Sequence, residues 1–480
     1  MSMLEKIVVY ATLVAMSAFV FTGVLVRPSA VLVGLMLLLV VLALKNIGWL
    51  RCACTQEEDG IDSRFFPILL SGLCVRIAIA LMYCPRLVAD CAKFWDGIKA
   101  WCVGDFIETK SYSLTLLYSM IQYVCGGPNL QLNQFINVAL GVLQIWLTYD
   151  MASRLFHNRK AGIVGAALVA FHPAFIFMTV GLYAEPLFGV LVLLTFKMLL
   201  TVSEFISSGV SDRRVVVSSA LLGFVGMSAF YCRGNGVFLF LAVGVAFLVF
   251  LSGPVTRKTV MMKVFCPCAS VCIAMATTVG VCNIHMLGHF VVSSSEDSIW
   301  PVIVGTNVKT GGKWVVPCED VKLIKSRFAS AYPGEKFDLH KAVPIIKAEV
   351  SRRWCEHPWE MLKLSWRKYR DMWSGDEQWV AWQLNREDRA AHFEHWYILR
   401  SPMKLLKSAE SLCMLLALTF LPVLKRPARL VVVAMCGFVL FNVANHLFIE
   451  SAYRYSYPFI LLLPVLCSGV VMCFKEKKRC

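Results

Sequence analysis

The sequence predicts an all-α protein that crosses a membrane many times. Of its 480 residues, 58% are hydrophobic and only 16% are charged, and the mean hydropathy is +0.66. A soluble globular protein is about half apolar and about a quarter charged. The apolar runs also lack the strict alternation of barrel strands. Because lipid cannot satisfy exposed backbone polar groups, the membrane-crossing segments are expected to be helices.

The apolar runs divide the chain into about 12 spans, each near the roughly 20 residues that a helix needs to cross the hydrocarbon core. The expected spans are 7–26, 30–49, 65–83, 133–155, 161–179, 183–202, 215–232, 235–252, 264–285, 404–424, 429–449 and 455–474. Arg76 lies within the third span, and a charged group at that depth is expected to face the interior of the bundle.

The cations predict the orientation. The net charge is +16, and most cations between spans fall in alternate loops, as the positive-inside rule requires when both termini are cytoplasmic. The short opposite loops carry only Arg27, Arg233 and Arg454. No basic tract is long enough to indicate a nucleic-acid partner, so the charge points to membrane lipids.

Four regions follow from this topology. They are 1–64, with two extra N-terminal helices and a cytoplasmic loop; 65–285, a membrane core with an outer loop at 84–132; 286–403, a large outer loop; and 404–480, with the last helices and a basic cytoplasmic tail. Within the first outer loop, Leu114–Val124 is too short to span and predicts a helix at the membrane interface. Ala342–Trp373 has helical periodicity with Arg and Lys on one face.

Two acids in the first outer loop are candidates for proton transfer. Asp90 and Asp96 are six residues apart, which on a helix separates them by about 120°, so they need not act as a pair. Either carboxylate alone is able to act as a general base toward an attacking hydroxyl or amine. The alternative is a solvated loop acid, which spacing alone favours.

Glu185 begins a span on the outer side and precedes a proline. Exposing its carboxylate to lipid is costly, so it is expected to face a cavity or a partner. The alternative is an acid stabilised by the helix dipole at a helix start.

Arg233 and Arg454 are cations on the side where the positive-inside rule disfavours them. An outer cation at a helix end suggests an anionic partner, and phosphate matches the guanidinium fork. Lys93, close to Asp90, is a further candidate for the same role. The alternative is that these side chains extend to lipid headgroups.

The stretch Gly305–Gly312 opens the large outer loop. Its glycines permit close backbone approach to a ligand, so Asn307 and Lys309 are candidate acceptor-site residues. It lacks the order of a nucleotide-binding P-loop, since Trp314 follows Gly312–Lys313, and the alternative is a structural turn. No pattern of His, Cys or acids predicts a metal site, and no cofactor is required, although a divalent cation stays open.

A series of segments occurs in a characteristic order along roughly 65–474: Asp90–Phe94, Asn137–Phe156, Ala166–Ile176, Tyr183–Phe188, Arg233, Gly305–Gly312, Glu356–Trp373 and Tyr453–Tyr455 with Pro458. In this order they resemble the bacterial glycosyltransferase family 39-like membrane proteins of the GT-C superfamily. The chain departs from the pattern at Cys91, at Tyr231–Asn235 and at Ser111–Leu114, where the family has a proline-rich segment.

The resemblance implies a GT-C-type bundle and a transferase that moves a sugar from a polyprenyl-phosphate donor to a glycan, lipid or protein acceptor outside a bacterial inner membrane. By this analogy Asp90, rather than Asp96, is the base. Arg233 and Arg454 hold the lipid phosphate, and Glu185 lines the cavity.

Two other functions stay open. His172–Phe177, Tyr183–Phe188 and Arg233–Gly236 also resemble the second mannosyltransferase of GPI-anchor synthesis in the endoplasmic reticulum. A lipid-linked sugar flippase or transporter is a third possibility, for which Arg76 within a span is suggestive, whereas internal symmetry is not apparent.

Overall fold

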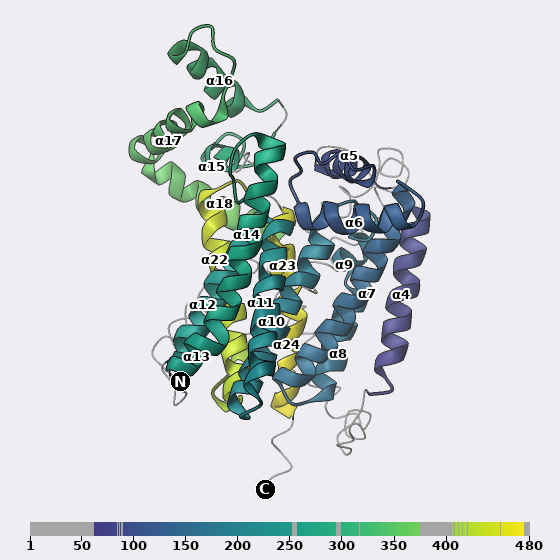
Figure 1. Ribbon diagram of the computed structural model, residues 1–480. Coiled ribbons are helices and arrows are strands. Elements are labelled where there is room, and N and C mark those ends of the chain that lie inside the picture. The colour runs from purple at the N-terminus through teal and green to yellow at the C-terminus, as the bar shows by residue number, and fades with distance from the viewer. Residues whose placement is uncertain are drawn as a thin grey trace. The chain divides into compact units, whose positions relative to one another are not determined.

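The computed structural model describes residues 62–374 and 406–474, apart from short gaps at 84, 86, 88–89, 252–256, 294–298, 316, 407–408, 411, 415, 420 and 452. The expected spans at 7–26 and 30–49, and part of the one at 404–424, lie outside these residues. The described chain is built from helices (Figure 1). It divides into two compact units: unit 2 contains 295–375 and 440–456, and unit 1 contains the remainder.

Unit 1 is an α-helical membrane bundle. Six described helices are long and apolar enough to cross a bilayer, which confirms an all-α, polytopic membrane fold. They are α4 (Phe65–Met82), α7 (Leu130–Leu155), α10 (Glu185–Ser207), α11 (Asp212–Cys232), the helix Met261–Leu287 and α22 (Arg426–Phe448). The helix Met261–Leu287 consists of the π-helical turn η2 (Met261–Phe265) and α14 (Cys266–Leu287). Shorter apolar helices are α8 (Arg159–Phe171), α12 (Val237–Leu251), α23 (Tyr457–Ile460) and α24 (Leu462–Cys467), the last followed by η6 (Ser468–Phe474).

Arg76 lies inside unit 1, as predicted, and is completely buried. Its guanidinium donates to the carbonyl of Gly72 at 3.1 Å on its own helix α4. It also donates to the carbonyls of Val169 and Ala170, each at 2.9 Å, on α8. A buried cation with backbone partners on a second helix joins the two helices, so Arg76 has a structural role in α4–α8 packing.

Two short helices lie across one end of the bundle, at the top of Figure 1. They are α5 (Asp90–Cys102) and α6 (Tyr112–Val124), and we call this the α5–α6 end. The Tyr118 hydroxyl donates to Asn137 Oδ1 at 2.5 Å, and Gln122 Nε2 donates to Asn133 Oδ1 at 2.8 Å. These buried polar contacts attach α6 to α7.

The span expected at 161–179 is divided in the structure. Helix α8 ends at Phe171, and a short helix α9 (Pro173–Phe177) follows. Proline disfavours helical geometry in the residue before it, and His172 accordingly adopts an extended conformation and accepts a bond from Ala174 N at 3.1 Å. A buried non-helical segment, 178–184, then leads into α10. Its Gly181 carbonyl accepts a hydrogen bond from Asn137 Nδ2 at 2.8 Å, which replaces the backbone hydrogen bond that a continuous helix would supply.

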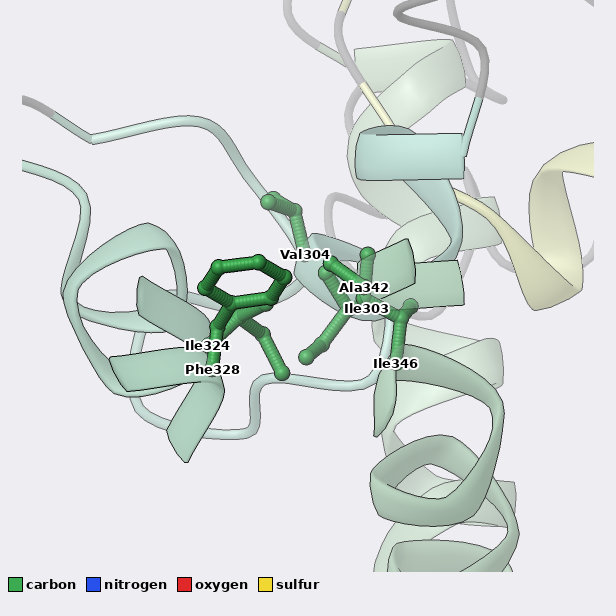
Figure 2. Close-up of a cluster of buried hydrophobic side chains, with 6 residues drawn as sticks. All are labelled: Ile303, Val304, Ile324, Phe328, Ala342 and Ile346. Carbon is green, nitrogen blue, oxygen red and sulfur yellow. The ribbon is translucent and has the colours of Figure 1, made fainter. Parts of the chain in front are cut away.

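Unit 2 has its own small hydrophobic core. Helices α15 (Trp300–Val304), α16 (Glu319–Ala331) and α17 (Leu339–Glu356) meet around six buried side chains (Figure 2). These side chains are Ile303, Val304, Ile324, Phe328, Ala342 and Ile346. The stretch 342–373, expected to be helical, forms two helices because Pro358 follows the end of α17 and begins α18 (Pro358–Ser374).

Helix α18 and the last residues of α22 complete unit 2. Lys368 on α18 is buried, and its Nζ donates to the carbonyls of Gly305 at 2.9 Å and Ile449 at 3.0 Å. The backbone N–H of Ser451 donates to the Gly312 carbonyl at 2.9 Å. The short helix η5 (Tyr453–Ser456) follows and packs on α18.

Candidate functional site

A buried ion pair lies at the α5–α6 end of unit 1. Glu185 is the first residue of α10, and Arg233 follows the last residue of α11. Arg233 Nη1 donates to Glu185 Oε1, and the side chains are only 3% and 15% exposed for Glu185 and Arg233. Removing one member of such a pair leaves the other charge buried, so the pair fixes the ends of α10 and α11 relative to each other.

The turn after Arg233 explains how that side chain is held. Arg233 is extended, and the residues Gly234–Gly236 form a single 3-10 turn (η1) before α12 begins. A Cβ on Gly236 would lie 2.5 Å from the backbone nitrogen of Phe230. Only glycine lets the turn fold so closely onto the end of α11.

A second acid–base pair joins the start of α5 to the start of α6. Asp90 Oδ1 accepts from Lys110 Nζ at 3.1 Å, and the Asp90 side chain is 22% exposed. Lys110 directly precedes Ser111, the N-terminal flanking residue of α6. The Asp90 carboxylate is therefore positioned by both helices and is reachable from solvent, in contrast to Glu185.

Two hydrogen bonds join the start of α6 to the end of α11. Ser111 Oγ donates to the Cys232 carbonyl at 2.7 Å, and Ser113 Oγ donates to the Ser228 carbonyl at 2.7 Å. Lys110 and Ser111 are consecutive, as are Cys232 and Arg233. The Asp90–Lys110 pair and the Glu185–Arg233 pair are therefore linked through the Ser111–Cys232 contact between their sequence neighbours, and we call these four side chains together the acid–base cluster.

The other two candidates on α5 do not join this cluster through any described contact. Lys93 is exposed. Asp96 is also exposed and makes an ion pair with Lys99 at 2.9 Å, one turn along the same helix. An exposed pair three residues apart contributes little to stability and is typical of a solvated helix face.

The remaining candidates belong to unit 2. Asn307 is buried in the turn after α15, where its Nδ2 donates to Asp320 Oδ2 at 2.8 Å and its Oδ1 accepts from Thr310 N at 3.3 Å. Lys309 is exposed in the same turn. Arg454 lies within η5, but its side chain lies outside the part of the structure that is described.

The sequence interpretation missed Lys110. The signal was present, because Lys110 is a cation in a loop predicted to be outside, the same signal that singled out Arg233. Its partner Asp90 is 20 residues earlier, and only the folding of α5 against α6 brings the two together.

No metal site emerges in the described part of the chain, where no group of three or more His, Cys, Asp or Glu side chains is placed to hold an ion.

Comparisons with known proteins give one kind of match. No family model matches the sequence, and no curated protein matches it either. Among solved structures, the chain is similar to the crystal structure of ArnT from Cupriavidus metallidurans bound to undecaprenyl phosphate. The alignment has a TM-score of 0.41 and 12% identity, and it covers 84% of this chain and 77% of that one.

Proposed function

We propose that this protein is an integral-membrane glycosyltransferase of the bacterial inner membrane. It would transfer a sugar from a polyprenyl-phosphate donor to a glycan, lipid or protein acceptor on the outer side. The observation that carries the proposal is the acid–base cluster, in which a solvent-reachable carboxylate lies beside cations at one end of a membrane bundle. The order of the family-like segments in the sequence supports the same function.

In this proposal Asp90 is the general base. An acceptor hydroxyl or amine gives its proton to the Asp90 carboxylate while its oxygen or nitrogen forms a bond to the anomeric carbon of the sugar. The bond between that carbon and the phosphate oxygen breaks, and the polyprenyl phosphate leaves with the electron pair. Lys110 orients the carboxylate through its contact at 3.1 Å.

The cations stabilise the leaving phosphate. Negative charge grows on the phosphate as the glycosidic bond breaks, and positioned cations lower the free energy of that state. Arg233 is pre-oriented by Glu185, so its guanidinium loses little conformational freedom when phosphate binds. We assign the same role to Arg454 and Lys93, and we assign Asn307 and Lys309 to acceptor binding.

Replacing Asp90 by Asn tests the base assignment. The full-length protein in nanodiscs is supplied with a panel of undecaprenyl-phosphate pentoses and hexoses, and release of undecaprenyl phosphate is measured in the presence of a membrane extract as acceptor source. We expect Asp90→Asn to lower turnover at least about 100-fold. The matched control is Asp96→Asn, because Asp96 is an exposed acid on the same helix. Full activity of Asp90→Asn, with the variant folded, would contradict the assignment.

Arg76, the residue that suggested a transporter, has a packing role in the structure. The Arg76 guanidinium is completely buried and is held by three backbone carbonyls. A cation with these partners joins helices.

A further inference from the structure

Helix α18 of unit 2 has two different apolar faces. One face is buried in the unit and contains Met361, Leu364 and Met372. On the opposite side Trp359 is 74% exposed, Leu362 53% and Trp366 49%. Their spacing of three and four residues aligns them in one stripe along the helix. A helix that packs only on its own unit needs one apolar face, so the exposed stripe requires a second partner.

Three cations lie beside this stripe. Lys363, Arg367 and Arg370 are exposed, and a helical repeat of 3.6 residues places them together along the flank next to Trp359 and Trp366. Glu360 is the one exposed acid on α18. Tryptophan beside Lys and Arg is the combination typical of a helix lying in a membrane interface, where the rings enter the headgroup region and the cations meet anionic lipids.

The depth of α18 is set by the end of a membrane span. Helix α22 is apolar enough to cross a bilayer and ends at Phe448. Ser365 Oγ on α18 donates to the Leu447 carbonyl at 2.9 Å, and Lys368 Nζ donates to the Ile449 carbonyl at 3.0 Å. On the preceding helix α17, the ring of Trp354 lies 5.6 Å from the ring of Phe448. The two hydrogen bonds from Ser365 and Lys368 hold α18 beside the residues with which the span ends, which is the level of the lipid headgroups.

We infer that α18 is an interfacial helix. Trp359, Leu362 and Trp366 enter the headgroup layer of the bilayer, and Lys363, Arg367 and Arg370 bind anionic phospholipid headgroups there. Because Lys368 on the buried face holds Gly305 and Ile449, the same helix keeps the Gly305–Gly312 turn at the membrane surface. The inference stands independently of the proposed sugar transfer, since it uses only the exposure, charge and contacts of α18.

Lipid photo-crosslinking tests the inference. The full-length protein is placed in phosphatidylcholine nanodiscs that contain a trace of one photoreactive lipid probe. The probe is phosphatidylglycerol in one sample and phosphatidylcholine in the other, and both carry the same diazirine near the headgroup. After irradiation, labelled peptides are identified by mass spectrometry. We expect the α18 peptide to be labelled by both probes, and several-fold more by the phosphatidylglycerol probe.

Two sets of variants separate the apolar stripe from the cations. The variant Trp359→Gln/Leu362→Gln/Trp366→Gln is expected to lose labelling of α18 by both probes. The variant Lys363→Gln/Arg367→Gln/Arg370→Gln is expected to lose only the excess given by phosphatidylglycerol. Trp314→Gln is the matched control, because Trp314 is an exposed tryptophan of the same unit outside α18, and it should leave the labelling unchanged. If the triple apolar variant does not fold, Trp359→Gln alone, at the most exposed position, gives the same comparison with a smaller loss.

Two results would overturn the inference. An unlabelled α18 peptide, in a sample whose α4 peptide is labelled, would mean that protein rather than lipid covers the stripe. Equal labelling by the two probes, unaffected by the cation variant, would show that the three cations do not select anionic headgroups.

Discussion

At the residue scale, the Glu185–Arg233 pair shows why two charges are tolerated near the end of a bundle. Burying either charge alone is expensive, and the contact compensates only while both partners remain. The pair also lies next to the Cys232 carbonyl that accepts from Ser111, so its geometry is coupled to the start of α6. Damage to the pair is therefore expected to reach Asp90 through Lys110.

A double-mutant cycle measures this coupling. We expect Glu185→Gln and Arg233→Gln each to lower the free energy of unfolding by about 3 kcal/mol, because each leaves the other charge buried without its counter-ion. The double variant should lose less than the sum of the two. Thermal unfolding in detergent, followed by intrinsic fluorescence, gives the three values. Strict additivity would indicate that the contact contributes no interaction energy.

Residue chemistry in the site was predictable where a charge interrupts an apolar sequence. Glu185, Arg233 and Arg76 are identified in this way, because exposing a charged side chain to lipid is costly and such a residue is expected to have a polar partner. The pairing of Glu185 with Arg233 was not predictable, since the two residues are 48 positions apart and meet only when α10 packs against α11. Asp90 and Asp96 are both candidates from the sequence, and their different environments appear only in the structure: Lys110, which precedes α6, contacts Asp90, whereas Asp96 pairs with Lys99 on its own helix.

At the element scale, the turn between α11 and α12 joins two apolar helices with four residues, Arg233–Gly236. Gly236 carries the steric constraint, because its Cα lies against the backbone of Phe230. Gly234, two residues earlier, has nothing within 4 Å of the position where a Cβ would stand. The two glycines thus form a natural comparison.

We expect Gly236→Ala to lower the free energy of unfolding by about 1–3 kcal/mol, because the methyl group cannot be accommodated without moving the backbone. Gly234→Ala is the control and should leave stability within about 0.5 kcal/mol of the original. Because Arg233 precedes this turn, Gly236→Ala should also weaken donor binding in the transfer assay. Equal effects of the two substitutions would show that the close approach at Gly236 is not a constraint.

The helices themselves were predictable because hydrophobic runs of sufficient length have few alternatives in a membrane. The interruptions were harder. Pro173 and Pro358 each stand at a break that was predicted as continuous helix. A proline is compatible with a kinked span as well as with a helix end. Whether the helix ends depends on partners for the freed backbone groups, such as Asn137, whose Nδ2 donates a hydrogen bond to the Gly181 carbonyl.

At the scale of the whole molecule, unit 2 depends on a buried acid. The Glu349 carboxylate accepts bonds from Arg352 at 2.9 Å and from Arg353 at 2.8 Å, and Arg327 adds an ion pair at 2.8 Å. These contacts, with Arg352 the largest, lower the pKa of Glu349 to about 2 from its ordinary value of 4.5. The folded state therefore binds this proton less readily than the unfolded state does.

The sign of the pH dependence follows from this difference. The stabilisation from Glu349 is fully present above about pH 4.5 and is lost as the pH falls toward 2. We expect Glu349→Gln to cost about 3 kcal/mol at neutral pH and to remove this acid dependence. Both the loss of stability and its dependence on pH are measured by hydrogen exchange of the α17 peptide, corrected for intrinsic exchange rates. Glu356→Gln is the control, because Glu356 contacts Arg352 from an exposed position, and it should cost less than about 1 kcal/mol.

The composition of unit 2 shows the limit of prediction at this scale. Hydropathy assigned 429–449 and 455–474 to two spans and 286–403 to a separate loop. In the structure, residues 440–456 belong to the same compact unit as 295–375. This grouping depends on single side chains such as Lys368 and Ser365, which bond carbonyls beyond residue 446, and no periodicity reports such contacts.

The discontinuous composition of unit 2 has a consequence for biosynthesis. Lys368 bonds a carbonyl that lies 81 residues later in the chain. At ordinary rates of translation, that carbonyl is made on the order of ten seconds after the lysine. The bonds of Ser365 and Lys368 to Leu447 and Ile449 cannot form until α22 has been synthesised, because these acceptors lie at the end of that helix. We therefore expect completion of unit 2 to wait for the synthesis of a late transmembrane helix.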